Sequence, residues 1–403
     1  MTFAEFLRGY FNSAVLARLI EAQTPADSVI FNRVFTNRQN RATDMVNLAQ
    51  ITRATKSMPV ISRGGQAIPL DPKNANSTWI EPLAVRLSDY ISGATLNRLK
   101  ALWNTGENGQ DLVQAELDKI ISDLMRSSEL TRNALCAQAL TGTIDYQQDS
   151  NGMKERYIIK FGDPQTYTLD KLLSEPDATL VDLIMLLNGM KKKMSDGGFA
   201  GSPIILAGSN AFSTICNLIT ATPYSERFGA SINSSVVSIT GFNIELDDGS
   251  YADTDEAGKT VIKDAVDKNK MVMVLAGYAE LDYMAIDDVN GNLQALPFFS
   301  KTIEISDPSG FKVISESKPM PLVAPKAICW ATVTDSLGAR SPMNININTS
   351  EGRKYTNTQL SAFNKEKILT IAKDRGYDMT KTAANTKEEI ITEFLDLQTK
   401  ANI

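Results

Sequence analysis

MVNLAQITRATKSMPVISRGGQAIPLDP, which runs from Met45 to Pro72, constrains the fold more than any other stretch. Short apolar pairs alternate in it with polar residues and turn formers, and helix signals are few. The pattern continues to about residue 90, so we predict a long two-stranded excursion over residues 45–90 with little core of its own. A loop of this length in a compact domain is either functional or wrongly assigned.

The centre of this stretch combines a fixed positive charge with a free backbone. Arg63 precedes Gly64 and Gly65, and apolar residues flank the three. Glycine adopts backbone angles closed to other residues, so the chain can bend here or lie close to a foreign backbone. Three interpretations fit: a nucleotide-binding loop, a bend in an arm that lies on another subunit, and a solvated turn.

The composition describes a soluble globular protein. The chain has 403 residues, 43% of them hydrophobic and 22% charged, which gives a prior of two or three domains. Its net charge of -6 argues against a general nucleic-acid-binding surface. The apolar runs are too short to span a bilayer, and the first fifteen residues have the pattern of an amphipathic helix, not of a signal peptide.

Histidine is absent, which removes the commonest general base and the commonest metal ligand. The three cysteines, Cys136, Cys216 and Cys329, are far apart and form no metal-binding pair or disulfide framework. We expect buried thiols at Cys136, in a helical pattern, and at Cys329, in a strand-like one, and synthesis in a reducing cytoplasm. We therefore predict no cofactor, no metal site and no enzyme; a catalytic site in this chain would have to use carboxylates or lysines.

Hydrophobic periodicity predicts one very long helix and then a compact mixed section. From Gln110 to Leu140 apolar residues recur at spacings of three and four. A hairpin with Asn151-Gly152 in its turn follows. Between about 165 and 300 we expect a helix over ATLVDLIMLLNGMKKKM, a short helix over SNAFSTICNLI, and strands at SPIILAG, TGFNIEL and MVMVLAGY. Long strands return from Ile303.

Three short segments resemble ligand-binding loops. SDGGFAG, from Ser195, is glycine-rich, but a helix precedes it, whereas phosphate loops precede a helix; a helix C-terminal turn is the better interpretation. DDGSYADTDEAG, from Asp247, could hold calcium but lacks the EF-hand spacing, so we expect a solvated hairpin tip. IDDVNGN, from Ile286, is interpreted as a tight turn.

The composition shifts at about Thr334, and a small helical unit follows. Residues 336–350 are rich in Ser, Asn, Thr and Gly and are predicted to be a linker. Within 351–403, Asn364 can cap one helix and Thr386 begins a capping box before a second. The unit has nine Lys and Arg against eight Asp and Glu, too balanced for a strong phosphate-binding surface. Its helix–extended loop–helix pattern resembles SAP and LEM-like domains.

Four segments, in order, resemble the lambda-type family called major capsid protein E of tailed phages. They are the opening stretch, SSELTRNALCAQALTGTIDY from Ser127, KNKMVMVLAGYAELDYMAIDD from Lys268, and SDPSGFKVISESKPMPLVAPKAICWATV from Ser306. The resemblance covers about residues 10–335. It implies an α+β fold of the Hong Kong 97 type, with an N-terminal arm, an extended loop, a peripheral domain with a long spine helix, and an axial domain.

The resemblance also implies how the chain is divided. The N-terminal helix and arm would occupy 1–44, the extended loop 45–92, the peripheral domain with its spine helix 93–164 and 301–335, and the axial domain 165–300. The linker 336–350 and the helical module 351–403 depart from the family pattern. In this context we expect Arg63, Gly64 and Gly65 to form an intersubunit contact, with Arg63 paired to a carboxylate.

The implied function is self-assembly. Many copies would form hexamers and pentamers that close into an icosahedral head around double-stranded DNA, without sequence-specific binding and without a membrane. Portal, scaffold and decoration proteins are the further partners, and the virion, assembled in the host cytoplasm, is the location. One alternative is an encapsulin-like compartment, which nucleic acid in purified particles would separate from a phage head. Another is a carboxylate-dependent enzyme of the mixed section.

Overall fold

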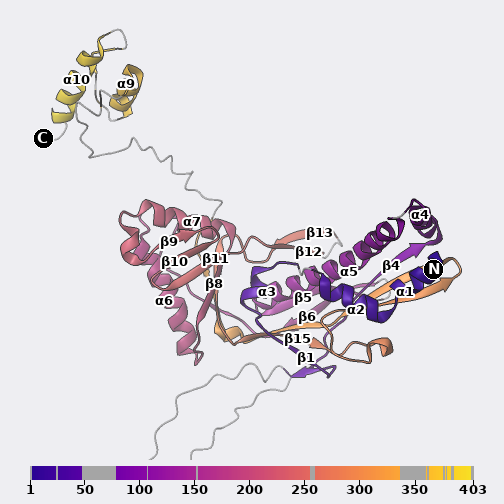
Figure 1. Cartoon of the computed structure of the whole chain (residues 1–403). Coiled ribbons are helices and arrows are strands. Elements are labelled where there is room, and N and C mark those ends of the chain that lie inside the picture. Colours follow the sequence, from indigo (N-terminus) through magenta and orange to yellow (C-terminus); the bar gives the residue numbers. More distant parts are fainter. Residues whose placement is uncertain are drawn as a thin grey trace, which may run out of the picture. The chain divides into compact units, whose positions relative to one another are not determined.

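The computed structural model describes residues 2–23, 26–47, 79–106, 108–150, 153–254, 259–335, 360, 363–374, 377, 379–382 and 385–400. The chain divides into two compact units, residues 1–337 and 338–403 (Figure 1). We describe each unit by itself.

A seven-stranded mixed sheet organises one part of the first unit. Its strands, in spatial order, are β7 (Gln165–Thr166), β19 (Ile328–Thr332), β14 (Lys270–Leu275), β8 (Pro203–Ala207), β11 (Phe242–Leu246), β10 (Val236–Ile239) and β9 (Ser231–Asn233). β8 runs parallel to β11 and antiparallel to β14. Both faces of the central strands are buried, which explains why PIILA and KMVMVL are nearly continuous apolar runs.

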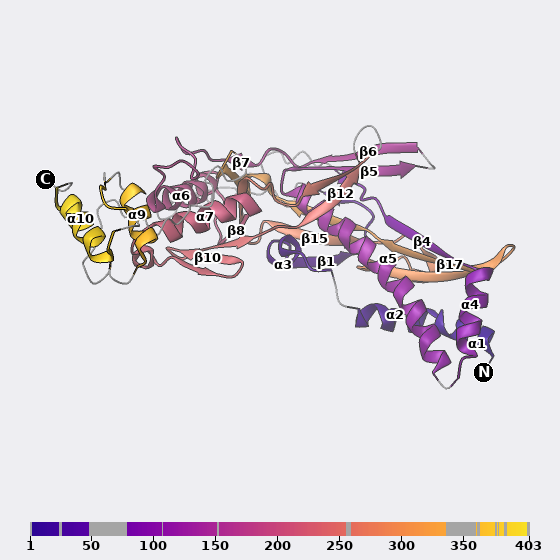
Figure 2. The same cartoon turned by 90° about the horizontal axis from the view of Figure 1, so that it is seen from above.

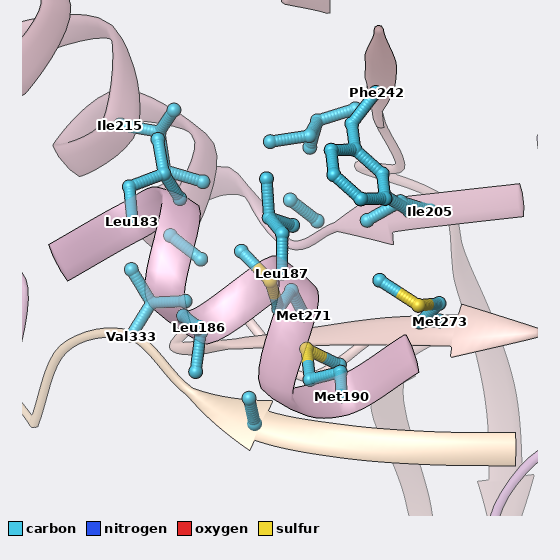
Figure 3. Packing of buried hydrophobic residues seen from close by; sticks show 14 of the residues in the cluster. Leu183, Leu186, Leu187, Met190, Ile205, Ile215, Phe242, Met271, Met273 and Val333 are labelled. Atoms are coloured by element: carbon cyan, nitrogen blue, oxygen red, sulfur yellow. The ribbon is translucent and has the colours of Figure 1, made fainter. Parts of the chain in front are cut away.

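Helices α6 (Leu180–Asp196) and α7 (Ser209–Ala221) cover one face of this sheet. Side chains from α6, such as Leu187 and Met190, meet Ile205 of β8 and Met273 of β14 in the largest core of the unit (Figure 3). α6 ends at Asp196, and Gly197 and Gly198 lead to β8, so the glycine-rich segment is the predicted helix C-terminal turn.

The spine helix α5 (Gly109–Ala139) joins two further cores. Its 31 residues correspond to a length of about 46 Å. The first half packs with α1, α2 and α4 against β4 and β17 (Figure 2). The last turns, including Leu135 and Cys136, pack against the second face of the seven-stranded sheet. Gly142 then turns the chain into β5 with a φ of +83°, where a Cβ atom would lie 2.1 Å from the Gly162 carbonyl oxygen.

The remaining strands form smaller sheets around α5. One sheet has the order β16 (Phe299–Ser306), β17 (Ser309–Ser317), β4 (Val85–Ser92), and another the order β1 (Asn37–Arg41), β15 (Ala279–Met284), β18 (Pro319–Val323). Three pairs complete the set: β5 (Thr143–Ser150) with β6 (Met153–Lys160), β12 (Ser250–Thr254) with β13 (Thr260–Asp264), and β2 (Val46–Asn47) with β3 (Trp79–Ile80). Short 3-10 turns are η2 (Ser225–Phe228), η3 (Val289–Gly291) and η4 (Pro325–Ala327).

The N-terminal segment is more folded than the sequence indicates. Two helices, α1 (Phe3–Tyr10) and α2 (Ser13–Ala22), replace the single expected one, and a capping box between Thr2 and Glu5 begins the first. α4 (Gly93–Trp103) lies beside them in the same core. The segment expected to be an extended arm includes helix α3 (Val29–Arg33) before strand β1.

The second unit contains α9 (Lys365–Asp374) and α10 (Lys387–Lys400) around its own small core. α9 begins directly after Asn364, and the Thr386–Glu389 capping box is present, as predicted. The predicted linker lies outside the described residues. The limits given above for arm, extended loop, peripheral domain and axial domain remain predictions.

Most of the elements predicted from periodicity are confirmed. They are the long helix, the β5–β6 hairpin, helices α6 and α7, and the strands from β16 to β19. β4 pairs along its whole length with β17 and buries Ile91. The part of the excursion without a core of its own therefore ends before Val85.

Candidate assembly interfaces

The residues on either side of the predicted excursion lie next to each other in the structure. β2 and β3 pair antiparallel there, with Val46 opposite Ile80 and Asn47 opposite Trp79. Val46 is buried in the core, whereas Trp79 is 58% exposed. Arg63, Gly64 and Gly65 lie outside the described residues, between these two strands. Their expected role as an intersubunit contact therefore remains a prediction.

A buried charge cluster fixes the arm directly before this point. Arg41, at the end of β1, forms ion pairs with Glu280, at 3.0 Å, and with Asp282, both on the neighbouring strand β15. The Asp282 side chain is fully buried. Burial, and then the negative charge of Glu280, raise the pKa of Asp282 to about 6 against the opposing effect of Arg41. The strand that leads to the excursion is thus held on the subunit's own sheet.

A second contact joins the arm to the spine helix. The guanidinium carbons of Arg38 and Arg132 lie 3.6 and 3.7 Å from the centroid of the Phe31 ring. Arg38 also donates hydrogen bonds to the carbonyl oxygens of Phe31 and Phe35. These contacts hold helix α3 and the start of β1 against the spine helix of the same chain.

The acidic segment from Asp247 is more buried than the sequence predicts. Asp253 was expected in a solvated hairpin tip, but its side chain in strand β12 is only 1% exposed. Lys263, at 2.6 Å, and Arg156, at 3.5 Å, neutralise it. Burial raises the pKa of Asp253, but these cations and a backbone N–H outweigh that effect and leave the pKa below its usual range.

The other acidic pair also forms ion pairs with lysines. Asp287 contacts Lys318 at 2.5 Å, and Asp288 contacts Lys301. The segment forms the 3-10 turn η3, in which Asp288 accepts a hydrogen bond from the backbone N–H of Asn290. Within the described ranges no group of three or more Cys, Asp or Glu could hold a metal ion.

The predicted buried thiols are confirmed at Cys136 and Cys329, which are both free and fully buried. Burial raises the pKa of Cys136 to about 12 and that of Cys329 to about 11, so both are protonated thiols at neutral pH. The described helices include none long and apolar enough to cross a membrane.

Several apolar side chains are exposed, and the sequence pattern did not predict their exposure. The most exposed are on loops and edge strands: Val289 (80%), Ile262 (66%), Tyr224 (63%) and Trp79 (58%). The strand β13, which contains Ile262, is exposed at all five of its residues. The adjacent pair Val261-Ile262 in a charged neighbourhood was the only signal in the sequence for this strand.

Comparison with known proteins gives one family. The model of the family described as phage major capsid protein E matches residues 12–333. No curated protein matches the chain. Because the match ends at residue 333, it leaves the second unit uncovered, and its resemblance to SAP and LEM-like domains stays a prediction.

Solved structures of similar fold are distant in sequence. A protein assigned as the capsid protein of an Escherichia coli CFT073 prophage is 16% identical, with a TM-score of 0.53, covering 80% of this chain and 99% of that one. A phage-related protein from Bordetella bronchiseptica RB50 is 10% identical, with a TM-score of 0.45, over 79% and 96%. The mature capsid of bacteriophage PhiM1 gives 12% identity and a TM-score of 0.42, over 78% and 90%.

Proposed function

Because this chain belongs to the phage major capsid protein E family, we propose that its copies assemble as hexamers and pentamers around double-stranded DNA. The chain is a major capsid protein of a tailed phage, with the α+β fold of the Hong Kong 97 type. It is a structural component of the virion that forms an icosahedral shell as a homo-oligomer, and it is not an enzyme. The match of the family model to residues 12–333 carries this conclusion.

Two features of the subunit support assembly by cumulative interface burial. Large apolar side chains such as Trp79 and Tyr224 are mostly exposed on the single chain, and neighbouring subunits would cover such side chains in the proposed shell. The -6 net charge suits a container that must not bind its genome tightly. Portal, scaffold and decoration proteins would complete the assembly in the host cytoplasm.

The long excursion is proposed to lie on a neighbouring subunit. The two strands at its ends, β2 and β3, are anchored by Val46 and by the Arg41 cluster. Gly64 and Gly65 would permit the bend, and Arg63 would pair with a carboxylate of the neighbour. Ordering by a partner explains why so long a stretch carries so little apolar pattern of its own.

Assembly is tested by expressing the chain alone. We expect hexamers, tubes or shells in electron micrographs and in light scattering, since intersubunit contacts account for much of the stability of such proteins. Double-stranded DNA in particles purified from infected cells would support a phage head and exclude a protein-cargo compartment. A monodisperse monomer across salt and protein concentrations would contradict the proposal.

The loop contact is tested by Arg63→Ala, with Arg63→Lys as the graded control. Leaving a buried partner charge unpaired costs about 3–5 kcal/mol, so Arg63→Ala shells should dissociate at lower guanidinium concentration. Lysine lacks the planar fork and should restore stability only in part. Circular dichroism of the dissociated subunits should be unchanged in both variants. If Arg63→Ala shells dissociate at the same guanidinium concentration as the unsubstituted shells, this stretch is a solvated turn and not an intersubunit contact.

A further inference from the structure

We propose that strand β13 is a docking edge, which pairs antiparallel with β13 of a second copy about a two-fold axis through Ile262. The inference goes beyond the shell function, and it rests on the homo-oligomeric assembly described above. It names one specific contact between copies, made by residues 260–264. It follows from the exposure of the strand, the direction of its backbone groups and the sequence of its five residues.

The hydrogen-bond pattern of the hairpin shows which backbone groups are free. The N–H of Ala265 donates to the carbonyl oxygen of Gly249 at 2.8 Å, in continuation of the β12–β13 register. Because antiparallel strands alternate between bonded and non-bonded pairs, Val261 and Lys263 bond inward to β12. The N–H and C=O groups of Thr260, Ile262 and Asp264 therefore point away from the hairpin.

Nothing in the described part of the chain pairs with this outward edge. No backbone bond from another described element reaches Thr260, Ile262 or Asp264. An open groove of about 620 Å³ is lined by Ile262 and Asp264 of the strand and by Tyr167, Tyr251 and Trp330.

The hairpin is also held firmly in place. Asp253 of β12 is buried, and its carboxylate contacts Arg156 of β6 as well as Lys263 of β13. Arg156 in addition donates to the carbonyl oxygen of Thr254 at 2.7 Å. An edge fixed in this way presents its free groups with little loss of conformational entropy on docking.

An exposed, apolar edge strand is a hazard in a monomer, because any unpaired strand can add to it. β13 contains no proline, its Lys263 is paired with Asp253 of the neighbouring strand β12, and its Val-Ile pair is exposed, Ile262 by 66% and Val261 by 38%. Such an edge is compatible with a soluble, functional protein when its normal state covers it. In a homo-oligomer the available partner is a second copy.

The sequence Thr-Val-Ile-Lys-Asp is complementary to itself in the antiparallel direction. Pairing about Ile262 sets Ile262 against the partner's Ile262, Thr260 against the partner's Asp264, and Val261 against the partner's Lys263. No like charges face each other, whereas a parallel pair would set lysine beside lysine and aspartate beside aspartate. Identical patches that meet in this way define a two-fold axis, which a closed icosahedral shell contains.

Residue-resolved hydrogen exchange tests this pairing directly, in shells assembled from this chain alone and in dissociated subunits. The outward N–H groups of Thr260, Ile262 and Asp264 should exchange freely in subunits and at least about 10-fold more slowly in shells. The inward N–H groups of Val261 and Lys263 should be protected in both. Equal exchange of the outward groups in shells and subunits would overturn the docking edge while leaving the shell function intact. Protection already present in subunits would overturn it as well, by showing that the chain covers its own edge.

A pair of matched variants tests the two-fold axis. In Ile262→Lys the introduced charges would face each other across the axis, so shells should dissociate at lower guanidinium concentration. Val289→Lys adds the same charge at an even more exposed residue, and Ile262→Val keeps the edge intact; both should leave the midpoint closer to that of the parent. A short thiol-to-thiol crosslinker should join Ile262→Cys subunits into dimers within shells, and Val289→Cys subunits much less. Absence of Ile262→Cys dimers, or an Ile262→Lys midpoint equal to that of the parent, would overturn the proposal.

Discussion

Two methionines on helix α6 show that the direction of a side chain decides how much it contributes to the free energy of unfolding. Met190 is fully buried in the core between α6 and the sheet (Figure 3), whereas Met185 on the same helix is 48% exposed. Met190→Ala should lower the free energy of unfolding by about 2–5 kcal/mol, because it removes buried methylenes and leaves a cavity. Met185→Ala should change it by less than about 0.5 kcal/mol. Guanidinium unfolding of the dissociated subunits measures both, and equal losses would contradict the packing of α6.

Asp282 gives a prediction about pH. Its pKa of about 6 in the folded chain exceeds the ordinary value of 3.8, so the folded state binds this proton more tightly than the unfolded state. The contribution of Asp282 to stability therefore rises as the pH falls from about 6 to about 4, by up to about 3 kcal/mol. Asp282→Asn is neutral throughout and should remove this rise, while Arg41 keeps Glu280 as its partner. Unfolding free energies measured between pH 4 and 7 with the same slope in both chains would contradict the assignment.

At the scale of elements, the contact between α6 and the segment after β7 overrides helix propensity. Gly189 lies inside α6, where alanine is ordinarily more stable by about 1 kcal/mol. A Cβ atom there would lie 2.2 Å from Cζ of the Tyr167 ring. Gly189→Ala should therefore destabilise the subunit instead, and adding Tyr167→Ala should recover part of the loss. Thermal unfolding of the single and double variants measures this coupling; a stabilised Gly189→Ala would show that the helix and Tyr167 are not in contact.

The elements that the sequence predicted are those with a local signal. The spacing of Val113, Leu117 and Ile121 is a property of α5 alone, and the same holds for the alternation in the hairpin that follows it. Helix α3 was missed because it has only five residues, too few for a periodic pattern, and Phe31 is held by Arg132 of α5. The burial of Asp253 was missed because it depends on a distant contact: its partner Arg156 lies far away in the sequence.

The proposed interface residues have a weaker signal in the sequence than the fold has, and the cause is physical. Arg63, Gly64 and Gly65 could be selected from composition, but the carboxylate that is proposed to pair with Arg63 would belong to another copy of the chain. The open edge of β13 has no periodic signature either, because all five of its residues are exposed on the single subunit. Hydrophobic periodicity reflects burial within one chain, so surfaces that are buried only on assembly show little periodicity.

At the scale of the whole molecule, the cores separate the shell-forming unit from the C-terminal one. Three clusters of buried residues lie within residues 1–337, and the fourth consists only of residues from the second unit, among them Ile368, Ile390 and Phe394. The second unit also satisfies its own polar groups: the Glu393 carboxylate accepts hydrogen bonds from the backbone N–H groups of Thr380 and Lys381, both at 2.8 Å. The two units thus have no need of a shared core.

A chain shortened after Asp335 should therefore still assemble. It loses the fourth core and none of the first three, so the guanidinium midpoint of its subunits should match that of the full chain within error. Phe394→Ala in the full chain is the matched control: it should destabilise the second unit by about 3–5 kcal/mol and leave the dissociation midpoint of the shells unchanged. Electron microscopy and light scattering measure assembly, and circular dichroism measures folding. If the shortened chain stays soluble and folded but no longer assembles, the second unit contributes to contacts between subunits, and the boundary of the shell-forming unit lies after residue 337.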